Sequence, residues 1–378
     1  MKLLDCCSIN PKKVNKFEGE RKYIATGDII NNKINTYSNV TFENRPSRAN
    51  IMIAENDVLF AKMKNTQKVI LGSKENIQNI YSTGFYCLTP NDKIKPKLLY
   101  YYLCSKLFNN LKDSKCTGAT MKGLNDSGIK SIDIKLPEMN IQNKIIKEFD
   151  LIKEAIENRK NTINDINKLV ESQFVNLFGN LMENEKKWNV KTLDELCLKI
   201  TDGKHGGCKT QKNSGYFFIG ATEINNKKIN YESANQITEE DFKKDYSRCD
   251  LMIGDLLIVN TGATIGKTAI ATDENYTCKT LLQKSVALLR PNKEKILPEF
   301  LQYCYICNES LYNKGQGCAR KNLLISQIKN TRVFVPPLNL QKEFVLLVEQ
   351  LEKQIKMCEC DINDLECLLE QKMYKYFN

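Results

Sequence analysis

The sequence predicts an α+β protein in which two globular heads are separated by two long antiparallel coiled-coil helices, each head combining a mainly antiparallel sheet with helices. Three observations lead to this prediction. The 378-residue chain repeats itself at an offset of 199 residues, the back of each half carries heptads, and the front of each half contains short β-rich runs. The repeat therefore implies an internal duplication with pseudo-two-fold character.

The repeat is clearest where each front part meets its back part. Leu136–Gln142 reads LPEMNIQ and Val335–Gln341 reads VPPLNLQ, and further along Ile163–Ile166 matches Ile362–Leu365 at the same offset. The match fades toward the front of each half, where Asn56–Phe60 still resembles Gly254–Ile258. Several ordered matches at nearly one offset indicate a duplication, whereas one match alone could come from a shared type of helix.

The back parts, about residues 140–178 and 339–378, contain no proline or glycine and are predicted to be helices. Pro137 and Pro336 precede them, and Asn140 and Asn339 are the predicted N-caps. About 38 residues make a helix of roughly 57 Å. The predicted segments are 1–136 (first head), 137–179 (central helical region), 180–335 (second head) and 336–378 (C-terminal helical region).

Apolar residues in both helices recur in alternating steps of four and three, which is the pattern of a coiled-coil seam. We expect the two seams to pair with each other or to serve in docking a partner; the alternative is two separate surface helices on a larger core. The predicted seam consists of Ile145, Phe149, Ile152, Ile156, Ile163 and Ile166 in the first copy, and Phe344, Val348, Leu351, Ile355, Ile362 and Leu365 in the second.

The front parts alternate short β-rich runs with Gly, Asn and Asp, which is typical of an antiparallel sheet. In the second copy the predicted strands are Tyr216–Ile219, Asp255–Val259, Lys267–Ile270 and Ser285–Leu289. Pro96–Leu107 and Pro298–Leu311 are predicted to be helices.

The positive charge is concentrated in the heads. The chain has 56 Lys and Arg against 45 Asp and Glu, a net charge of +11. Residues 1–135 carry 22 basic and 12 acidic residues, and residues 181–334 carry 23 and 18, whereas both helical regions are slightly acidic. We therefore expect two basic heads that grip a polyanion at two places, rather than a helix pair that binds it along its length.

The composition excludes several classes of protein. No segment approaches the roughly 18 apolar residues of a membrane helix, and Met1–Cys7 turns polar too soon for a signal peptide. Fifteen cysteines, an odd number, indicate reduced thiols in the cytoplasm, most of them acting as small buried hydrophobes. One CxxC pair, Cys304 and Cys307, and a lone His205 do not suffice for a zinc site or for most histidine catalysis.

No motif assembles a catalytic set or a cofactor site. Gly262–Thr268 resembles a phosphate loop, but only three residues separate its glycines where four are needed, and it lies between two strand-like runs. We interpret it as a hairpin turn. The sequence predicts no catalytic residue, no metal and no cofactor bound by this chain.

Two polar basic regions are the candidates for contact with a nucleic acid, through phosphates and base edges. The alternatives are a solvated connection for the first and an ordinary charged surface for the second. The first is a glycine-rich loop of the second copy with Thr201, Asp202, Lys204, His205, Lys209 and Lys212. The second, in the first copy, holds Arg45, Arg48, Lys62, Lys64 and Lys68, and Thr261, Thr264 and Lys267 around the glycine-bounded turn complete the candidates.

These residues resemble the specificity (S) subunits of type I restriction–modification systems over essentially the whole chain. Thr201–His205 looks like the family's Asp-Gly-Thr-His loop, with Lys204 in place of the usual threonine. Gly254–Ile258 with Gly262–Gly266 is similar to a segment of the target-recognition domain, and Val335–Gln341 looks like the opening of the conserved helical region. The first head departs from this pattern, because it lacks the loop and reads AKMKN at Ala61–Asn65.

The resemblance implies a DNA reader without an active site. Two target-recognition domains would each read half of a split DNA site, and the helix pair would hold them at a fixed spacing. Methyltransferase (M) subunits, two of them, would dock and methylate adenine N6 with S-adenosylmethionine, and motor–nuclease (R) subunits would join and use ATP. The alternative function is a coiled-coil interaction protein whose basic heads bind RNA or a membrane non-specifically.

Overall fold

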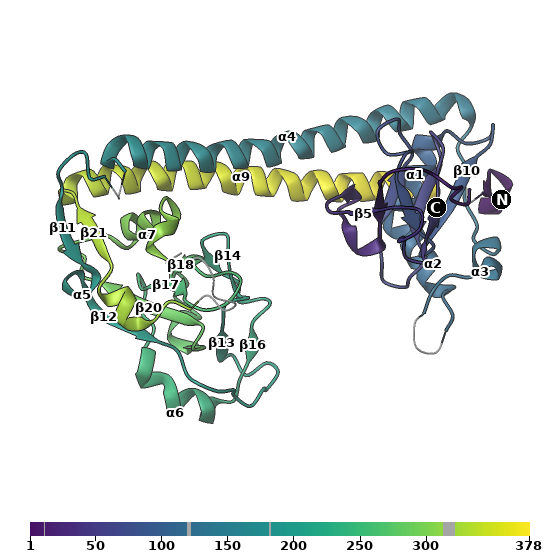
Figure 1. The fold of residues 1–378 in the computed structure, drawn as a ribbon. Coiled ribbons are helices and arrows are strands. Elements are labelled where there is room, and N and C mark those ends of the chain that lie inside the picture. Colours follow the sequence, from purple (N-terminus) through teal and green to yellow (C-terminus); the bar gives the residue numbers. More distant parts are fainter. Residues whose placement is uncertain (11, 119–121, 181–182, 313–321) are drawn as a thin grey trace. The chain divides into compact units, whose positions relative to one another are not determined.

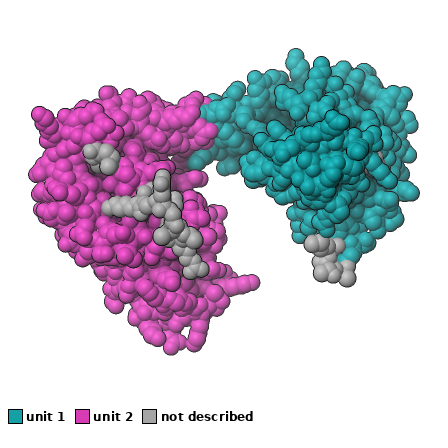
Figure 2. Space-filling view, in the orientation of Figure 1, with its two compact units in different colours: residues 1–161, 358–378 teal, residues 162–357 magenta. Residues whose placement is uncertain are grey.

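The computed structural model describes residues 1–10, 12–118, 122–180, 183–312 and 322–378. The chain divides into two compact units, coloured separately in Figure 2: residues 1–161 with 358–378 form unit 1, and residues 162–357 form unit 2. Each unit thus contains one head and part of both long helices. The four chain segments that the sequence predicts are a different division and stay a prediction.

Unit 1 contains a mostly antiparallel head (Figure 1). One sheet has the strand order β1-β10-β7-β8, a second has the order β5-β2-β9-β6, and β3 and β4 form a separate hairpin. One pair, β2 with β9, is parallel. The strands are β1 (Cys7–Ile9), β2 (Arg21–Ile24), β3 (Ile29–Ile30), β4 (Lys33–Ile34), β5 (Ser38–Val40), β6 (Ala49–Ile51), β7 (Val58–Ala61), β8 (Val69–Leu71), β9 (Ile80–Ser82) and β10 (Phe85–Pro90), and the helices are α1 (Pro96–Cys104), α2 (Lys106–Ser114) and α3 (Asp126–Lys130).

The predicted helix Pro96–Leu107 is two helices, because Ser105 interrupts it. Ser105 has an extended backbone, with ψ 151°, and its side chain accepts a hydrogen bond from Phe108 N at 3.1 Å. It therefore acts as the N-cap of α2. Pro96 occupies the first turn of α1, where a missing backbone N–H costs nothing.

Unit 2 repeats this architecture. Its main sheet has the order β12-β20-β17-β18, a second has the order β16-β13-β19 with β13 and β19 parallel, and two further pairs are β14-β15 and β11-β21. The strands are β11 (Asn189–Thr192), β12 (Cys197–Asp202), β13 (Phe217–Ile219), β14 (Ile224–Asn225), β15 (Lys228–Ile229), β16 (Asn235–Gln236), β17 (Leu256–Val259), β18 (Thr268–Ile270), β19 (Thr280–Leu282), β20 (Val286–Pro291) and β21 (Arg332–Val335). The helices are α5 (Leu193–Leu196), α6 (Glu239–Cys249), α7 (Pro298–Ile306) and α8 (Ile325–Lys329), and the predicted helix Pro298–Leu311 is α7 followed by a 3₁₀ turn at Glu309–Leu311.

The main sheets of the two heads have the same strand order, so the duplication extends over the front parts, where the sequence match fades. The strand order β1-β10-β7-β8 corresponds to β12-β20-β17-β18, and the small hairpin β3-β4 corresponds to β14-β15. Helix α6 is an addition of the second head. Within unit 2 it lies on the side of the head away from the long helices (Figure 1). The predicted fold class is confirmed, with one parallel strand pair in each head as a detail that the sequence did not predict.

The long helices are α4 (Met139–Phe178) and α9 (Leu338–Phe377), within one or two residues of the prediction. The predicted N-caps are wrong, because Asn140 and Asn339 lie inside the first turn. The first helical hydrogen bonds are accepted by the carbonyl oxygens of Glu138, at 2.9 Å from Ile141 N, and of Pro337, at 3.2 Å from Gln341 N. These carbonyls, one residue before each helix, mark the true caps.

The predicted seam lies between the two helices in both units, so the alternative of two separate surface helices is wrong. In unit 1, Phe149 near the start of α4 lies 6.3 Å from Phe377 at the end of α9, between ring centroids. In unit 2, Phe178 at the end of α4 lies 5.5 Å from Phe344 near the start of α9. The helices therefore run antiparallel within each unit. All twelve predicted seam residues are buried or half-buried, so they hold the helices together and their role in partner docking stays untested.

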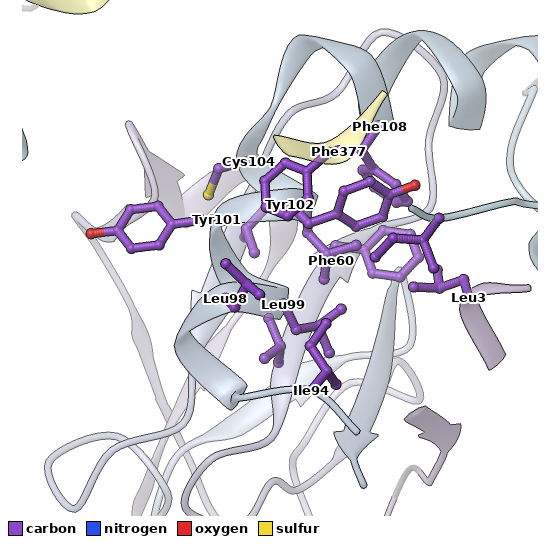
Figure 3. Close-up of a cluster of buried hydrophobic side chains, with 14 of the residues drawn as sticks. Leu3, Phe60, Ile94, Leu98, Leu99, Tyr101, Tyr102, Cys104, Phe108 and Phe377 are labelled. Atoms are coloured by element: carbon purple, nitrogen blue, oxygen red, sulfur yellow. The ribbon is translucent and has the colours of Figure 1, made fainter. Parts of the chain in front are cut away.

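Each head core continues into the helix pair. In unit 1, side chains from α1 gather with Phe60 of β7 and with Phe377 of α9 (Figure 3). Tyr102 lies 5.2 Å from Phe377 and Phe60 lies 5.1 Å from Phe108, between ring centroids. Aromatic side chains bury large apolar areas and interact edge to face, so this cluster fastens the head to the helices.

The described cysteines are all free thiols, and Cys318 lies outside the described residues. Seven of them are buried, as predicted, but Cys278, Cys360 and Cys367 are exposed. No group of three metal-ligating side chains occurs among the described residues. In the same part of the chain, no helix is both long and apolar enough to cross a membrane.

Candidate nucleic-acid interface

Most of the predicted contact residues gather at one edge of the main sheet in each head. In unit 2, Asp202 at the end of β12 pairs with Ala287, Val259 at the end of β17 pairs with Val286, and Ile258 pairs with Thr268. The loop after β12, the turn before β20 and the turn between β17 and β18 therefore lie at the same end of the strands. We call this end of the sheet, with these three connections, the reading edge of the second head.

The loop after β12 is fastened to α6, the helix that only the second head has. Lys204 forms an ion pair with Asp245, and Arg248 forms one with Asp202. The backbone N–H of Lys209 donates to Asp241 Oδ2 at 2.6 Å. Acidic and basic side chains of α6 thus tie the loop to this helix at three points.

The start of the loop also packs closely on the sheet. A Cβ on Gly203 would lie 2.2 Å from the carbonyl oxygen of Leu282, so only glycine fits there. Lys204 N donates to Leu282 O at 2.7 Å, and Lys284 N donates to Lys204 O at 3.0 Å. His205 is exposed, with Nε2 3.3 Å from Asp202 Oδ2.

The lysines of this loop differ in whether a carboxylate of the protein already pairs with their charge. The carboxylate of Asp245 raises the pKa of Lys204 and neutralises its charge locally. Lys209 and Lys212 carry exposed side chains, which the structure pairs with no carboxylate among the described residues. Phosphate contact from this loop would therefore come mainly from Lys209 and Lys212.

The turn between β17 and β18 is a hairpin turn, as the sequence predicts, and not a phosphate loop. Thr261 Oγ1 donates to Asn322 Oδ1 at 2.9 Å, and Lys267 Nζ donates to Asn225 Oδ1 of β14 at 2.8 Å. Thr264 lies half-buried in the turn. Gly266 has φ +90° and lies against the ring of Tyr312.

The first head has an equivalent edge, formed by the turn between β7 and β8. Lys62 lies over the ring of Tyr86 at 4.4 Å from its centroid, and burial lowers the pKa of Lys62. Lys64 is exposed, and Lys68 Nζ donates to Thr26 O at 2.6 Å. Lys68 and Lys267 are 199 residues apart, so the duplicated turns carry a lysine at the same place.

The two predicted arginines lie on the loop before β6. Arg45 stacks on Phe42 at 4.0 Å and donates to Phe42 O at 2.6 Å, so its side chain is engaged with its own loop. Arg48 is exposed, and its carbonyl accepts from Thr83 N at 2.9 Å. Thr83 precedes Gly84, whose carbonyl accepts from Lys62 N at 2.9 Å, so Arg48 lies along the backbone beside the reading edge of the first head.

Two exposed lysines at these edges escaped the sequence analysis. Lys122 O accepts from Lys64 N at 3.0 Å, and Lys284 is bonded to Lys204 through the backbone. Neither belongs to a motif or a cluster of charge. Only strand pairing between distant segments brings them to the edge, and a lone lysine carries no such signal.

The family comparison decides the identity of this duplicated architecture. The model of the type I restriction modification DNA specificity domain matches residues 2–168 and 185–366, which is one match for each copy and most of the chain. The chain belongs to this family. It is a specificity subunit, whose role is DNA sequence recognition, and the prediction that it is not itself an enzyme is confirmed by its membership.

Individual relatives agree with the family. The StySPI type I specificity subunit of Salmonella potsdam is 22% identical over 387 residues, 93% of this chain and 81% of that protein. The MjaX specificity subunit of Methanocaldococcus jannaschii is 27% identical over 197 residues, half of this chain and 45% of that protein, so the match spans less than half of its length. Membership does not favour the alternative of a non-specific RNA or membrane binder.

A solved structure supports the fold. A chain from work on complex assembly and conformational transition of the type I R-M system has a TM-score of 0.60 and 18% sequence identity, and the match covers 100% of this chain and 96% of that one. At this identity the likeness concerns the fold alone.

Proposed function

We propose that this specificity subunit reads a bipartite DNA site, with each head recognising one half-site across a gap of fixed length. The duplicated reading edge is the observation that carries the proposal. The same sheet edge occurs in both heads and presents a turn with a lysine at the same offset, Lys68 and Lys267. Two copies of one reader suit two separated half-sites better than one continuous site.

In this proposal, lysines and backbone amides at the edges meet phosphates, and neighbouring polar side chains meet base edges. Lys64, Lys209 and Lys212 are exposed candidate lysines suited to phosphates, and the exposed Lys122 and Lys284 lie at the same edges. Thr201, Thr261, Thr264 and His205 have polar atoms that suit base edges, which distinguish base pairs in the major groove. The excess of basic over acidic residues in both heads supports this assignment.

The helix pair would set the gap and dock the partners. Each helix has 40 residues, a length of about 60 Å, and its seam is occupied by its own side chains. The outward faces of the helix pair would therefore bind two methyltransferase subunits. Motor–nuclease subunits would join this assembly in the cytoplasm. S-adenosylmethionine and ATP would be used by those partners, with no cofactor on this chain.

A selection experiment tests the proposal. The chain, assembled with its methyltransferase subunit, is offered a pool of random duplex DNA, and bound molecules are sequenced after several rounds. We expect two enriched blocks at a constant separation. Binding of RNA or of anionic lipid vesicles with equal affinity, and no enriched sequence, would instead support the non-specific alternative.

A further inference from the structure

A fully buried lysine supports the reading turn of the first head. Lys112, near the end of α2, has a side chain that is 1% exposed. Its Nζ donates to Met63 O at 3.1 Å and to Thr66 O at 2.5 Å, and it lies 3.4 Å from Asp113 Oδ1. The ammonium group therefore directs its hydrogen bonds to the carbonyls of the turn between β7 and β8.

The neighbouring carboxylate of Asp113 accepts hydrogen bonds from the same turn. Asp113 Oδ1 and Oδ2 both accept from the backbone N–H of Asn65 at 3.1 Å. Asn65 has φ +55°, in the left-handed region that asparagine adopts more readily than most other residues. Lys112 and Asp113 thus hold the backbone at Met63, Asn65 and Thr66, between the candidate lysines Lys62, Lys64 and Lys68.

Full burial of this ammonium group is energetically costly. Burial lowers the pKa of Lys112, because an ammonium group loses its hydration, and such a charge is tolerated only with close acceptors. In the second head, the turn between β17 and β18 packs against the ring of Tyr312 at Gly266.

The two heads thus hold the turn at the equivalent place by different contacts, an ammonium group in the first head and an aromatic ring in the second. We propose that Lys112, with Asp113, is a positioning residue that sets the conformation of turn 63–66 for recognition of one half-site. This inference rests on the proposed function, since it assigns the turn of the first head to one half of the DNA site. It places no contact between Lys112 and DNA.

The test replaces Lys112 by leucine, which removes the ammonium group and leaves an apolar side chain at the buried position. Cells that express the chain with its methyltransferase partner are compared by methylome sequencing for wild type, Lys112→Leu and the matched control Lys106→Leu, which removes an exposed lysine from the same helix. We expect Lys112→Leu either to lower methylation of the wild-type motif at least tenfold or to broaden the set of bases accepted in one half-site. The other half-site and the gap should stay unchanged, and the control should match wild type.

A second readout separates positioning from phosphate contact. DNA affinity of the purified complex is measured against salt concentration. Lys64→Met should reduce the magnitude of the slope of log affinity against log salt concentration by about 0.9, as loss of one phosphate contact does. Lys112→Leu should weaken specific binding and leave this slope unchanged. A slope lowered by about 0.9 in Lys112→Leu would overturn the inference.

The remaining outcomes are also decisive. If Lys112→Leu does not fold, Asp113→Ala, at a partly exposed position, must relax the same half-site, and an unchanged motif there overturns the inference. An unchanged motif in a folded Lys112→Leu chain overturns it as well. A wild-type complex without a bipartite motif overturns the proposed function, and this inference with it.

Discussion

The side-chain oxygen of Gln142, Oε1, accepts a hydrogen bond from the backbone N–H of Lys95 at 2.9 Å, which joins the start of α4 to the N-cap of α1. The second copy repeats the contact, with Gln341 Oε1 accepting from Leu297 N at 2.9 Å. Both glutamines are 0% exposed. Each also donates to the proline carbonyl before its long helix, Pro137 O at 3.0 Å or Pro336 O at 2.9 Å. One buried side chain therefore sets where head and helix meet in each unit.

Replacing Gln142 by leucine should destabilise unit 1 by about 1–3 kcal/mol, because the buried N–H of Lys95 and the carbonyl of Pro137 lose their partner. Urea denaturation followed by circular dichroism measures this loss. The exposed neighbour Asn143→Ala is the control and should change stability little. Equal stability of Gln142→Leu and wild type would mean that the glutamine does not hold the junction.

The lysines of the loop after β12 should differ in their effect on DNA binding. Lys209→Met should reduce the salt slope of affinity by about 0.9, since its side chain is exposed and free to meet a phosphate. Lys204→Met should change the slope less, because Lys204 is already paired with Asp245. Fluorescence anisotropy over a series of salt concentrations measures both slopes. The reverse order would show that the Lys204–Asp245 pair opens on binding.

Acid should weaken the helix junction of unit 1 through Glu148. The ammonium of Lys372, with a further hydrogen bond from Tyr376, holds the pKa of Glu148 below its ordinary value of 4.5. A carboxylate with a lowered folded pKa stabilises the protein above its unfolded pKa, and that stabilisation is lost as the pH falls through the folded value. The urea midpoint of wild type should thus fall more steeply below about pH 4.5 than that of Glu148→Gln. Parallel curves for the two proteins would contradict this prediction.

Helix length should control the gap between the half-sites. Four residues added to one long helix near residue 161 lengthen it by about 6 Å, which corresponds to at most about two base pairs. Methylome sequencing should show a changed gap with both half-sites unchanged. Altered half-sites with the original gap would rule out the helices as the ruler.

The sequence alone predicts the long helices well, since heptads sustained over 40 residues leave little choice of structure. It places their caps two residues too late, because asparagine is a favoured N-cap whereas the first helical hydrogen bonds are accepted by the carbonyls of Glu138 and Pro337. The glutamine at each junction also bonds to a backbone N–H about 45 residues earlier in the chain, which no local pattern reveals. The equivalence of the two front parts is hidden for a similar reason. Strand order is set by backbone pairing, which tolerates different side chains, so topology persists where residue identity has faded.

The candidate site was predicted only in outline. The basic loop and turn do meet at one sheet edge, but Lys68, Lys204 and Lys267 are bonded within the protein by groups that no local pattern reveals. Asp245, for example, lies 41 residues after Lys204 on a helix that the first head lacks. Lys112 was invisible because a buried lysine and an exposed one look alike in a sequence.

The central claim is that two copies of one reader recognise two separated half-sites. The most direct test is methylome sequencing of cells that express this chain with its methyltransferase partner. The account predicts N6-methyladenine within a single motif made of two specific blocks and an unspecified gap of constant length. A continuous motif, or no adenine methylation although both proteins are expressed, would contradict it.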